Sequence, residues 1–90
     1  MFENLEQLIK KIRERKNSFP NQSYTSKLLN DKNLSVSKVK EEIGELFEAV
    51  EENSNKIHEA ADVIYHLMVY LESNNVKIED VMEELKRRQK

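Results

Sequence analysis

Cysteine is absent from this 90-residue sequence, and glycine and proline each occur only once. Without cysteine the chain can form neither a disulfide framework nor a thiolate zinc site. Folds made only of β-strands need many turns built from glycine and proline, so such a fold is disfavoured. The composition is instead rich in Glu, Lys and Leu, which favour helices. We therefore expect a single all-α domain over residues 1–90, a helical bundle of about four helices.

Strong charge of one sign and long apolar runs are also missing. There are 15 Lys and Arg against 17 Asp and Glu, so the formal net charge is only -2. This balance provides no general attraction to nucleic-acid polymers or to anionic membranes. No segment approaches the roughly 18 to 20 apolar residues of a membrane span, and the N-terminus does not resemble a signal peptide. We expect a cytoplasmic protein with no membrane partner.

Because a short chain buries a modest part of its surface, we expect a homodimer to complete the bundle.

Apolar residues that recur at steps of three and four predict four main helices. The predicted helices cover residues 3–16, 35–52, 56–73 and 78–88. Ser35 is a plausible N-cap of the second helix. The inward stripe expected there is Val36, Val39, Ile43, Leu46 and Val50. The stripe expected in the third helix is Ile57, Ala61, Ile64, Leu67, Met68 and Leu71.

Residues 17–33 are the loop-like part of the chain. Pro20 disfavours helical geometry in Phe19. A short helical turn can follow, with Thr25 or Ser26 as its cap. The connection near Ser54 is short, and short connections make neighbouring helices antiparallel. The second and third predicted helices should therefore form a hairpin.

Acidic side chains are placed on both arms of this hairpin. Glu42 and Glu45 are three residues apart, as are Glu59 and Asp62, and this spacing puts each pair on one helix face. Glu45 precedes the turn by about as many residues as Asp62 follows it, so the pairs can meet. Clustered carboxylates repel one another unless a cation joins them, and oxygen ligands suit Mg²⁺ or Mn²⁺. Glu41 adds a further carboxylate beside them.

The alternative is that these acids form a solvated helix surface. Asp62 argues against it, because it lies in the otherwise apolar segment Ala60-Ala61-Asp62-Val63-Ile64-Tyr65. His66 lies one turn later on the same face, and we interpret it as a structural group with satisfied hydrogen bonds rather than a catalyst. His58 is expected to be a surface residue near a helix start.

Phosphate recognition has to come from side chains or ions. A single glycine excludes a glycine-rich phosphate loop. The cations best placed by sequence are Lys27, Lys38 and Lys40.

Three stretches carry a family resemblance. Glu41-Glu42-Ile43-Gly44-Glu45 followed by Glu59-Ala60-Ala61-Asp62 resembles the EExxE…ExxD pattern of all-α nucleoside-triphosphate pyrophosphohydrolases, the MazG-like superfamily. Within it, three stretches are similar to the phosphoribosyl-ATP pyrophosphohydrolase family: Ser23-Tyr24-Thr25-Ser26-Lys27-Leu28, Lys38-Val39-Lys40-Glu41-Glu42 and Glu59-Ala60-Ala61-Asp62-Val63-Ile64-Tyr65-His66-Leu67.

The resemblance implies a Mg²⁺-dependent dimeric hydrolase whose active sites lie near the subunit interface. The implied reaction converts phosphoribosyl-ATP and water into phosphoribosyl-AMP and pyrophosphate, in histidine biosynthesis. The implied metal ligands are Glu42, Glu45, Glu59 and Asp62. Glu41, with Glu42, would orient or deprotonate water, and Lys27 and Lys38 would contact phosphates.

Two other functions remain open on the sequence. One is a related pyrophosphohydrolase that acts on another nucleoside triphosphate. The other is a non-catalytic helical dimerisation module whose acids are only surface charge. Mg²⁺-dependent pyrophosphate release distinguishes the enzymes from the module, and the preferred nucleotide distinguishes the enzymes from each other.

Overall fold

The computed structural model describes residues 1–89 and confirms the all-α fold, with five helices and no strand in that range. The helices are α1 (Glu3–Arg15), α2 (Tyr24–Leu29), α3 (Lys32–Glu52), α4 (Lys56–Ser73) and α5 (Ile78–Arg88). The short helical turn expected between residues 17 and 33 is the six-residue helix α2. None of these helices has the length and apolar character needed to cross a membrane.

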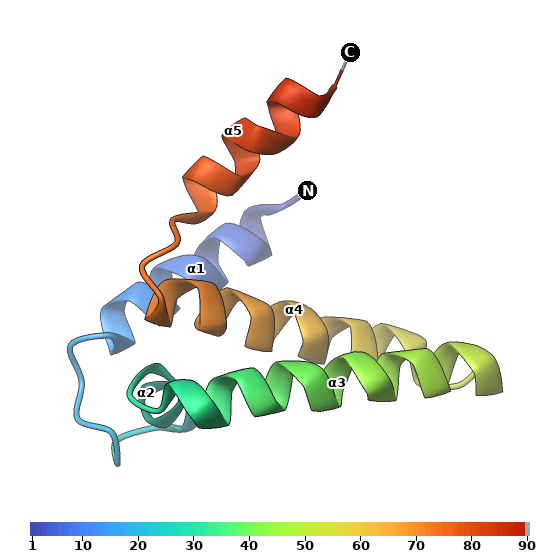
Figure 1. The fold of residues 1–90 in the computed structure, drawn as a ribbon, viewed down its shortest axis with the longest axis horizontal. Coiled ribbons are helices and arrows are strands. Elements are labelled where there is room, and N and C mark those ends of the chain that lie inside the picture. Colours follow the sequence, from blue (N-terminus) through green and yellow to red (C-terminus); the bar gives the residue numbers. More distant parts are fainter. Residues whose placement is uncertain (90) are drawn as a thin grey trace.

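Helices α3 and α4 form the predicted antiparallel hairpin and lie side by side along their length (Figure 1). The turn depends on Asn53 and Asn55, which adopt left-handed backbone conformations with φ of 55° and 54°. Asparagine tolerates this region better than other residues that carry a Cβ. The amide of Ser54 donates to the carbonyl of Ala49 at 3.0 Å and closes the end of α3. The hairpin fixes the level at which acids on the two helices meet.

Two predicted helix caps are wrong. Helix α3 begins three residues earlier than expected, because Asp31 accepts a hydrogen bond from the amide of Leu34 at 3.0 Å. Ser35 is therefore inside the helix and buried. Ser23 caps α2 by accepting from the amide of Ser26 at 3.0 Å, in place of Thr25 or Ser26. In both cases the residue with extended backbone directly before the helix takes the cap, as capping geometry requires.

The buried core joins α1, α2 and α4 at one end of the hairpin. Ile12, Leu28, Leu29 and Val69 form the central cluster, and Leu28 and Val69 are fully inaccessible to solvent. Short helix α2 thus contributes half of this cluster, although the sequence placed it in a loop-like region. Its packing against α4 holds the Ser23-Tyr24-Thr25 segment beside the hairpin.

Much of the predicted apolar stripe is exposed, which corrects the sequence interpretation. Val39 is buried as expected, but Val50 is 57% exposed and Ile57 is 89% exposed. Phe47, which the predicted stripe omitted, is 68% exposed. Periodicity identifies the apolar face of a helix, but it does not say whether the same chain covers that face.

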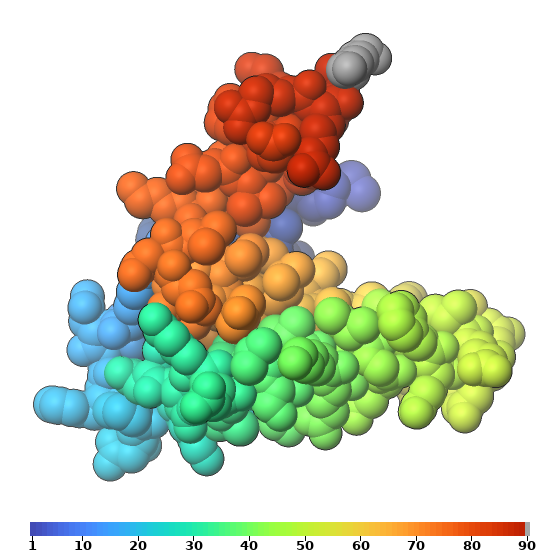
Figure 2. Space-filling view, in the orientation of Figure 1, coloured from blue at the N-terminus to red at the C-terminus, as the bar shows by residue number. Residues whose placement is uncertain are grey.

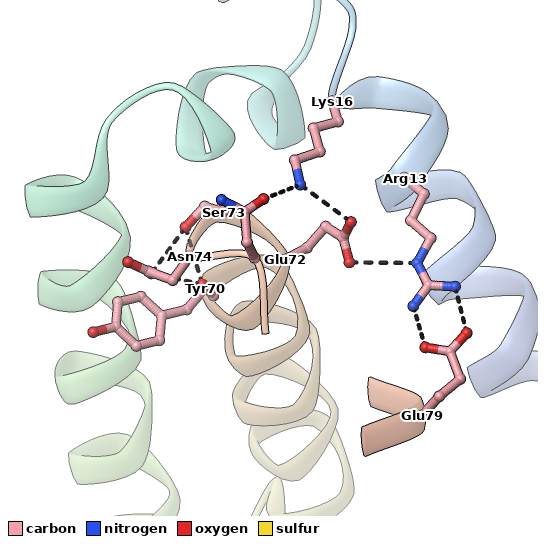
Figure 3. Close-up of polar contacts among 8 residues, drawn as sticks. Arg13, Lys16, Tyr70, Glu72, Ser73, Asn74 and Glu79 are labelled. Atoms are coloured by element: carbon pink, nitrogen blue, oxygen red, sulfur yellow. Dashed lines mark hydrogen bonds and ion pairs between the residues drawn. The ribbon is translucent and has the colours of Figure 1, made fainter. Parts of the chain in front are cut away.

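Helix α5 follows α4 and extends away from the hairpin (Figures 1 and 2). Arg13 of α1 donates to Glu79 of α5 through two guanidinium nitrogens and to Glu72 of α4 at 3.4 Å (Figure 3). Lys16 donates to the side-chain carbonyl of Asn75 at 2.8 Å. These contacts hold the three helices together where α4 ends. Met82 and Leu85 of α5 are each nearly half exposed.

Candidate active site

Acidic side chains from α3 and α4 meet across the hairpin. One carboxylate oxygen each from Glu42, Glu45 and Glu59 lies within 4.8 Å of the other two. A second group, with the same mutual distance limit, contains His58, Glu59 and Asp62. Glu59 belongs to both groups, so all four predicted metal ligands form one continuous cluster.

Burial and mutual repulsion change the acidity of this cluster. Glu42 is only 8% exposed. Burial raises the pKa of Glu42 to about 7, and a hydrogen bond with Glu45 and the charges of Glu45, Asp62 and Glu59 act in the same direction. Burial also raises the pKa of Glu59, with Glu45 adding to the effect and His58 opposing it. The folded chain therefore concentrates negative charge where that charge is poorly solvated.

Two carboxylate oxygens in the cluster are buried and lack a hydrogen-bond partner. They are Oε2 of Glu42 and Oε2 of Glu59. Buried polar atoms normally have partners, so a pair of orphaned oxygens in one cluster needs an explanation. A hard divalent cation satisfies such oxygens directly and removes the repulsion between the carboxylates. The residues present therefore fit a divalent metal ion bound by oxygen ligands.

Glu41 lies outside both groups, although it directly precedes Glu42 in the sequence. Its carboxylate accepts from Nζ of Lys38 at 2.9 Å on the exposed side of α3. This ion pair raises the pKa of Lys38, mainly through the hydrogen bond to Glu41. Consecutive helical residues point about 100° apart, so only one member of the Glu41-Glu42 pair can face α4. Lys27 and Lys40 are exposed.

His58 lies beside the acidic cluster, a position that the sequence interpretation did not anticipate. It is on the surface as expected, but its Nε2 lies 3.3 Å from Oδ2 of Asp62. The spacing of four residues between them is the signal that could have indicated this contact. The imidazole of His58 places a ring nitrogen that can ligate a metal ion at the solvent-exposed edge of the acidic cluster.

Aromatic and hydroxyl side chains from α2 and α4 meet beside this cluster. The hydroxyl of Tyr24 lies 3.0 Å from Nε2 of His66, and Nδ1 of His66 lies 2.8 Å from the backbone carbonyl of Asp62. The hydroxyls of Thr25 and Tyr65 are also hydrogen-bonded to each other. The interpretation of His66 as a buried, satisfied group is confirmed. Its partner Tyr24 could not be identified from sequence, because 42 positions separate the two.

The family model described as phosphoribosyl-ATP pyrophosphohydrolase matches residues 5–89 of the chain. The chain belongs to this family. Family membership confirms the resemblance inferred from the acidic and Tyr-His segments, and it classes the chain with hydrolases. The match spans all five helices apart from the first residues of α1.

Individual relatives agree with this family. The chain is 38% identical to a phosphoribosyl-ATP pyrophosphatase of Neisseria meningitidis serogroup C, over 87% of this chain and 76% of the relative. It is 37% identical to a phosphoribosyl-ATP pyrophosphatase of Caulobacter sp. strain K31, over 99% of this chain and 85% of the relative. It is also 42% identical to the chloroplastic histidine biosynthesis bifunctional protein hisIE of Arabidopsis thaliana, over 94% of this chain and 32% of that protein.

Proposed function

We propose that this chain hydrolyses phosphoribosyl-ATP to phosphoribosyl-AMP and pyrophosphate, as a step of histidine biosynthesis. The family match supports the substrate, and similarity to the histidine biosynthesis bifunctional protein supports the pathway. The observation that carries the chemistry is the pair of buried, unpartnered carboxylate oxygens on Glu42 and Glu59. Such a pair suits a site that is completed when a cation and a polyphosphate bind.

The proposed metal is Mg²⁺, with Mn²⁺ as a substitute, held by the four clustered carboxylates. These are Glu42, Glu45, Glu59 and Asp62. When bound, the ion supplies positive charge that offsets the polyphosphate charge and makes a nearby water more acidic. The hairpin supplies the geometry, because two carboxylates come from each helix and the two helices pack along their length.

Residues outside the cluster are proposed to supply the remaining groups. Glu41 is the proposed general base, which takes a proton as water attacks at the α–β phosphate linkage. The bond to the bridging oxygen breaks, and pyrophosphate leaves. Lys38 is already within 2.9 Å of Glu41, so its ammonium can pair with a phosphate beside the attacking water. Lys27 and Lys40 are further candidates for phosphate contacts.

The test is a pyrophosphate-release assay on phosphoribosyl-ATP and on the ordinary nucleoside triphosphates, with and without Mg²⁺. We expect Mg²⁺-dependent release from phosphoribosyl-ATP. Glu42→Gln and Asp62→Asn should each lower kcat at least about 100-fold while the far-ultraviolet circular dichroism stays unchanged. Glu51→Gln is the matched control, because Glu51 is an exposed acid on the same helix outside the cluster.

Each contrary result points to one of the other functions. Turnover of an ordinary triphosphate alone would replace the substrate and keep the pyrophosphohydrolase chemistry. No metal-dependent release from any nucleotide would leave a helical interaction module as the function.

We also infer that the chain forms a homodimer in the cytoplasm. Phe47 and Val50 are three residues apart on α3, share a face and are mostly exposed. Exposed apolar patches of this kind mark contact surfaces, and a second copy of the same chain is the simplest partner. A phosphorylated nucleotide does not cross membranes freely, so the enzyme and its substrate must share a compartment, and the cytoplasm is the compartment proposed here.

A further inference from the structure

Helices α1 and α5 are the two walls of an apolar groove. The groove has a volume of about 1110 Å³. Two turns of an α-helix that is about 10–12 Å across fill roughly 1000 Å³, so the groove can accept one helical segment of that length. Its apolar lining consists of Phe2, Leu5, Ile9, Ile78 and Met82.

Helix α5 borders this groove with its apolar side largely uncovered. It buries none of its residues, and Met82 and Leu85 are each nearly half exposed. The ion pair between Arg13 and Glu79 holds its first turn to α1 and closes the groove at that end (Figure 3). An amphipathic helix is stabilised when its apolar side packs against another element. The groove therefore offers a contact surface for such an element.

The outer stripe of α4 is apolar along its whole length but is covered over only half of it. Met68 and Leu71 line a small cavity together with residues of α1 and α5. Ile57 and Ile64 are 89% and 45% exposed, and Ala61 between them is exposed as well. Steps of three and four residues place all five on one face of the helix. The open half runs from Ile57 to Ile64, which is about two turns.

The chain cannot place this open half of α4 in its own groove. Helix α5 is joined to the end of α4 that lies farthest from Ile57 (Figure 1). Ile57 precedes Leu71 by 14 residues, which is about 21 Å along the helix axis. The pair of Arg13 and Glu79 holds α5 at the Leu71 end. A helix that fills the groove therefore has to come from another molecule.

Charge favours the first turns of α4 as the segment that fills the groove. Helix α4 begins with Lys56, and its N-cap Asn55 makes no side-chain hydrogen bond to the helix. The free backbone amides of the first turn add positive charge at this end. The acid of that turn, Glu59, faces α3 instead. Glutamates outnumber cations by four to two among the charged residues that line the groove, which are Glu6, Lys10, Arg13, Glu14, Glu79 and Glu83.

We propose that in the homodimer the first two turns of α4 of one subunit pack into the α1–α5 groove of the other, and that the second subunit makes the same contact in return. A two-fold axis makes the exchange reciprocal, so one assembly covers both open stripes and both grooves. The surface of Phe47 and Val50 on α3 belongs to the same assembly. This inference rests on the homodimer of the proposed function and names the surfaces through which its subunits meet.

Single aspartates test each half of the contact. Ile57→Asp on the stripe and Met82→Asp on the groove wall should each raise the dissociation constant of the dimer at least about 30-fold, as for loss of one strong contact residue. Light scattering over a dilution series measures this constant, and far-ultraviolet circular dichroism checks the fold. Phe19→Asp is the matched control, because Phe19 is exposed but lies outside both surfaces. A Met82→Asp protein that dimerises like the parent overturns the inference.

Cross-linking tests the pairing itself, because the chain has no cysteine of its own. Ile57→Cys and Met82→Cys proteins, one of them carrying a mass tag, exchange subunits and are treated with a short bismaleimide. We expect a covalent heterodimer from this mixture, and little product from either protein alone or from a mixture with Phe19→Cys. Absence of the heterodimer overturns the inference. So does a link within one chain of the double variant at high dilution, which would mean that α5 folds onto its own α4.

These measurements need neither substrate nor metal, so they are independent of the test of the hydrolase. Absent pyrophosphate release from a protein that forms the expected cross-link overturns the proposed reaction and keeps the contact. A monomeric parent protein overturns the contact and leaves the reaction to its own assay.

Discussion

Glu42 is the side chain in which burial and negative charge conflict most clearly. It is 8% exposed, faces three other carboxyl groups and has one oxygen without a partner. A residue in this situation lowers the stability of the metal-free fold when it ionises. A bound cation would reverse the effect, because it interacts with the ionised form.

This conflict predicts how the stability of the metal-free protein depends on pH. The pKa of Glu42 is about 7 in the folded chain against 4.5 for an ordinary glutamate, so the unfolded chain loses this proton first. The free energy of unfolding should therefore fall as pH rises from about 4.5 through 7, by about 1 to 3 kcal/mol. Urea denaturation in EDTA at pH 5 and pH 8 measures this change.

Glu42→Gln should remove most of that decrease, because an amide does not ionise, and Glu51→Gln should keep it. The opposite shift at Glu79, whose pKa Arg13 holds at about 2, gives stability that is lost only below pH 4.5. The Glu79 shift therefore adds nothing to the change in the free energy of unfolding between pH 5 and pH 8. Equal pH dependence in Glu42→Gln and the parent protein would contradict this account of Glu42.

At the scale of single helices, α3 depends on a cap that the sequence interpretation misplaced. The carboxylate of Asp31 accepts from the amide of Leu34, while Ser35 is buried one turn further on. Both residues are good caps in principle. The choice between them follows the backbone, which is extended at Asp31, with φ of -139° and ψ of 90°, and helical at Ser35.

Removing this cap should destabilise the fold without changing the active site. Asp31→Ala is expected to lower the free energy of unfolding by about 1 kcal/mol, and Asp31→Asn by much less, since asparagine is also a good cap. Urea denaturation of the three proteins at one pH measures the difference. If alanine and asparagine are equally destabilising, the charge of Asp31 matters and its capping hydrogen bond does not.

At the scale of the whole molecule, exposed apolar residues on α3 predict self-association. Phe47→Asp should convert a dimer into a monomer of 10.7 kDa, because it places a charge in the proposed contact surface. Light scattering after size-exclusion chromatography measures the mass. Phe19→Asp is the matched control, since Phe19 is also an exposed phenylalanine, 72% accessible, but lies outside α3. A monomeric parent protein would refute the predicted dimer.

Local patterns were sufficient for several features of this chain. The last two helices, Lys56–Ser73 and Ile78–Arg88, have the predicted bounds, because their periodicity is strong and the asparagine-containing turns before them involve near neighbours only. In the first of these turns, Asn53 and Asn55 both adopt the left-handed conformation that ends one helix and starts the next. The meeting of acids from α3 and α4 also follows from helix spacing and a short connection.

Contacts between distant segments were decided only by the tertiary structure. Which member of the Glu41-Glu42 pair faces α4 depends on how α3 is rotated in its packing, and the pairing of Tyr24 with His66 depends on where α2 docks. The sequence by itself determined the four long helices, their order and the residue types of the site, because these depend on spacing along one chain. Burial, the orphaned oxygens and the contact between Tyr24 and His66 arise only when separate helices come together, since each depends on atoms that the other helix supplies.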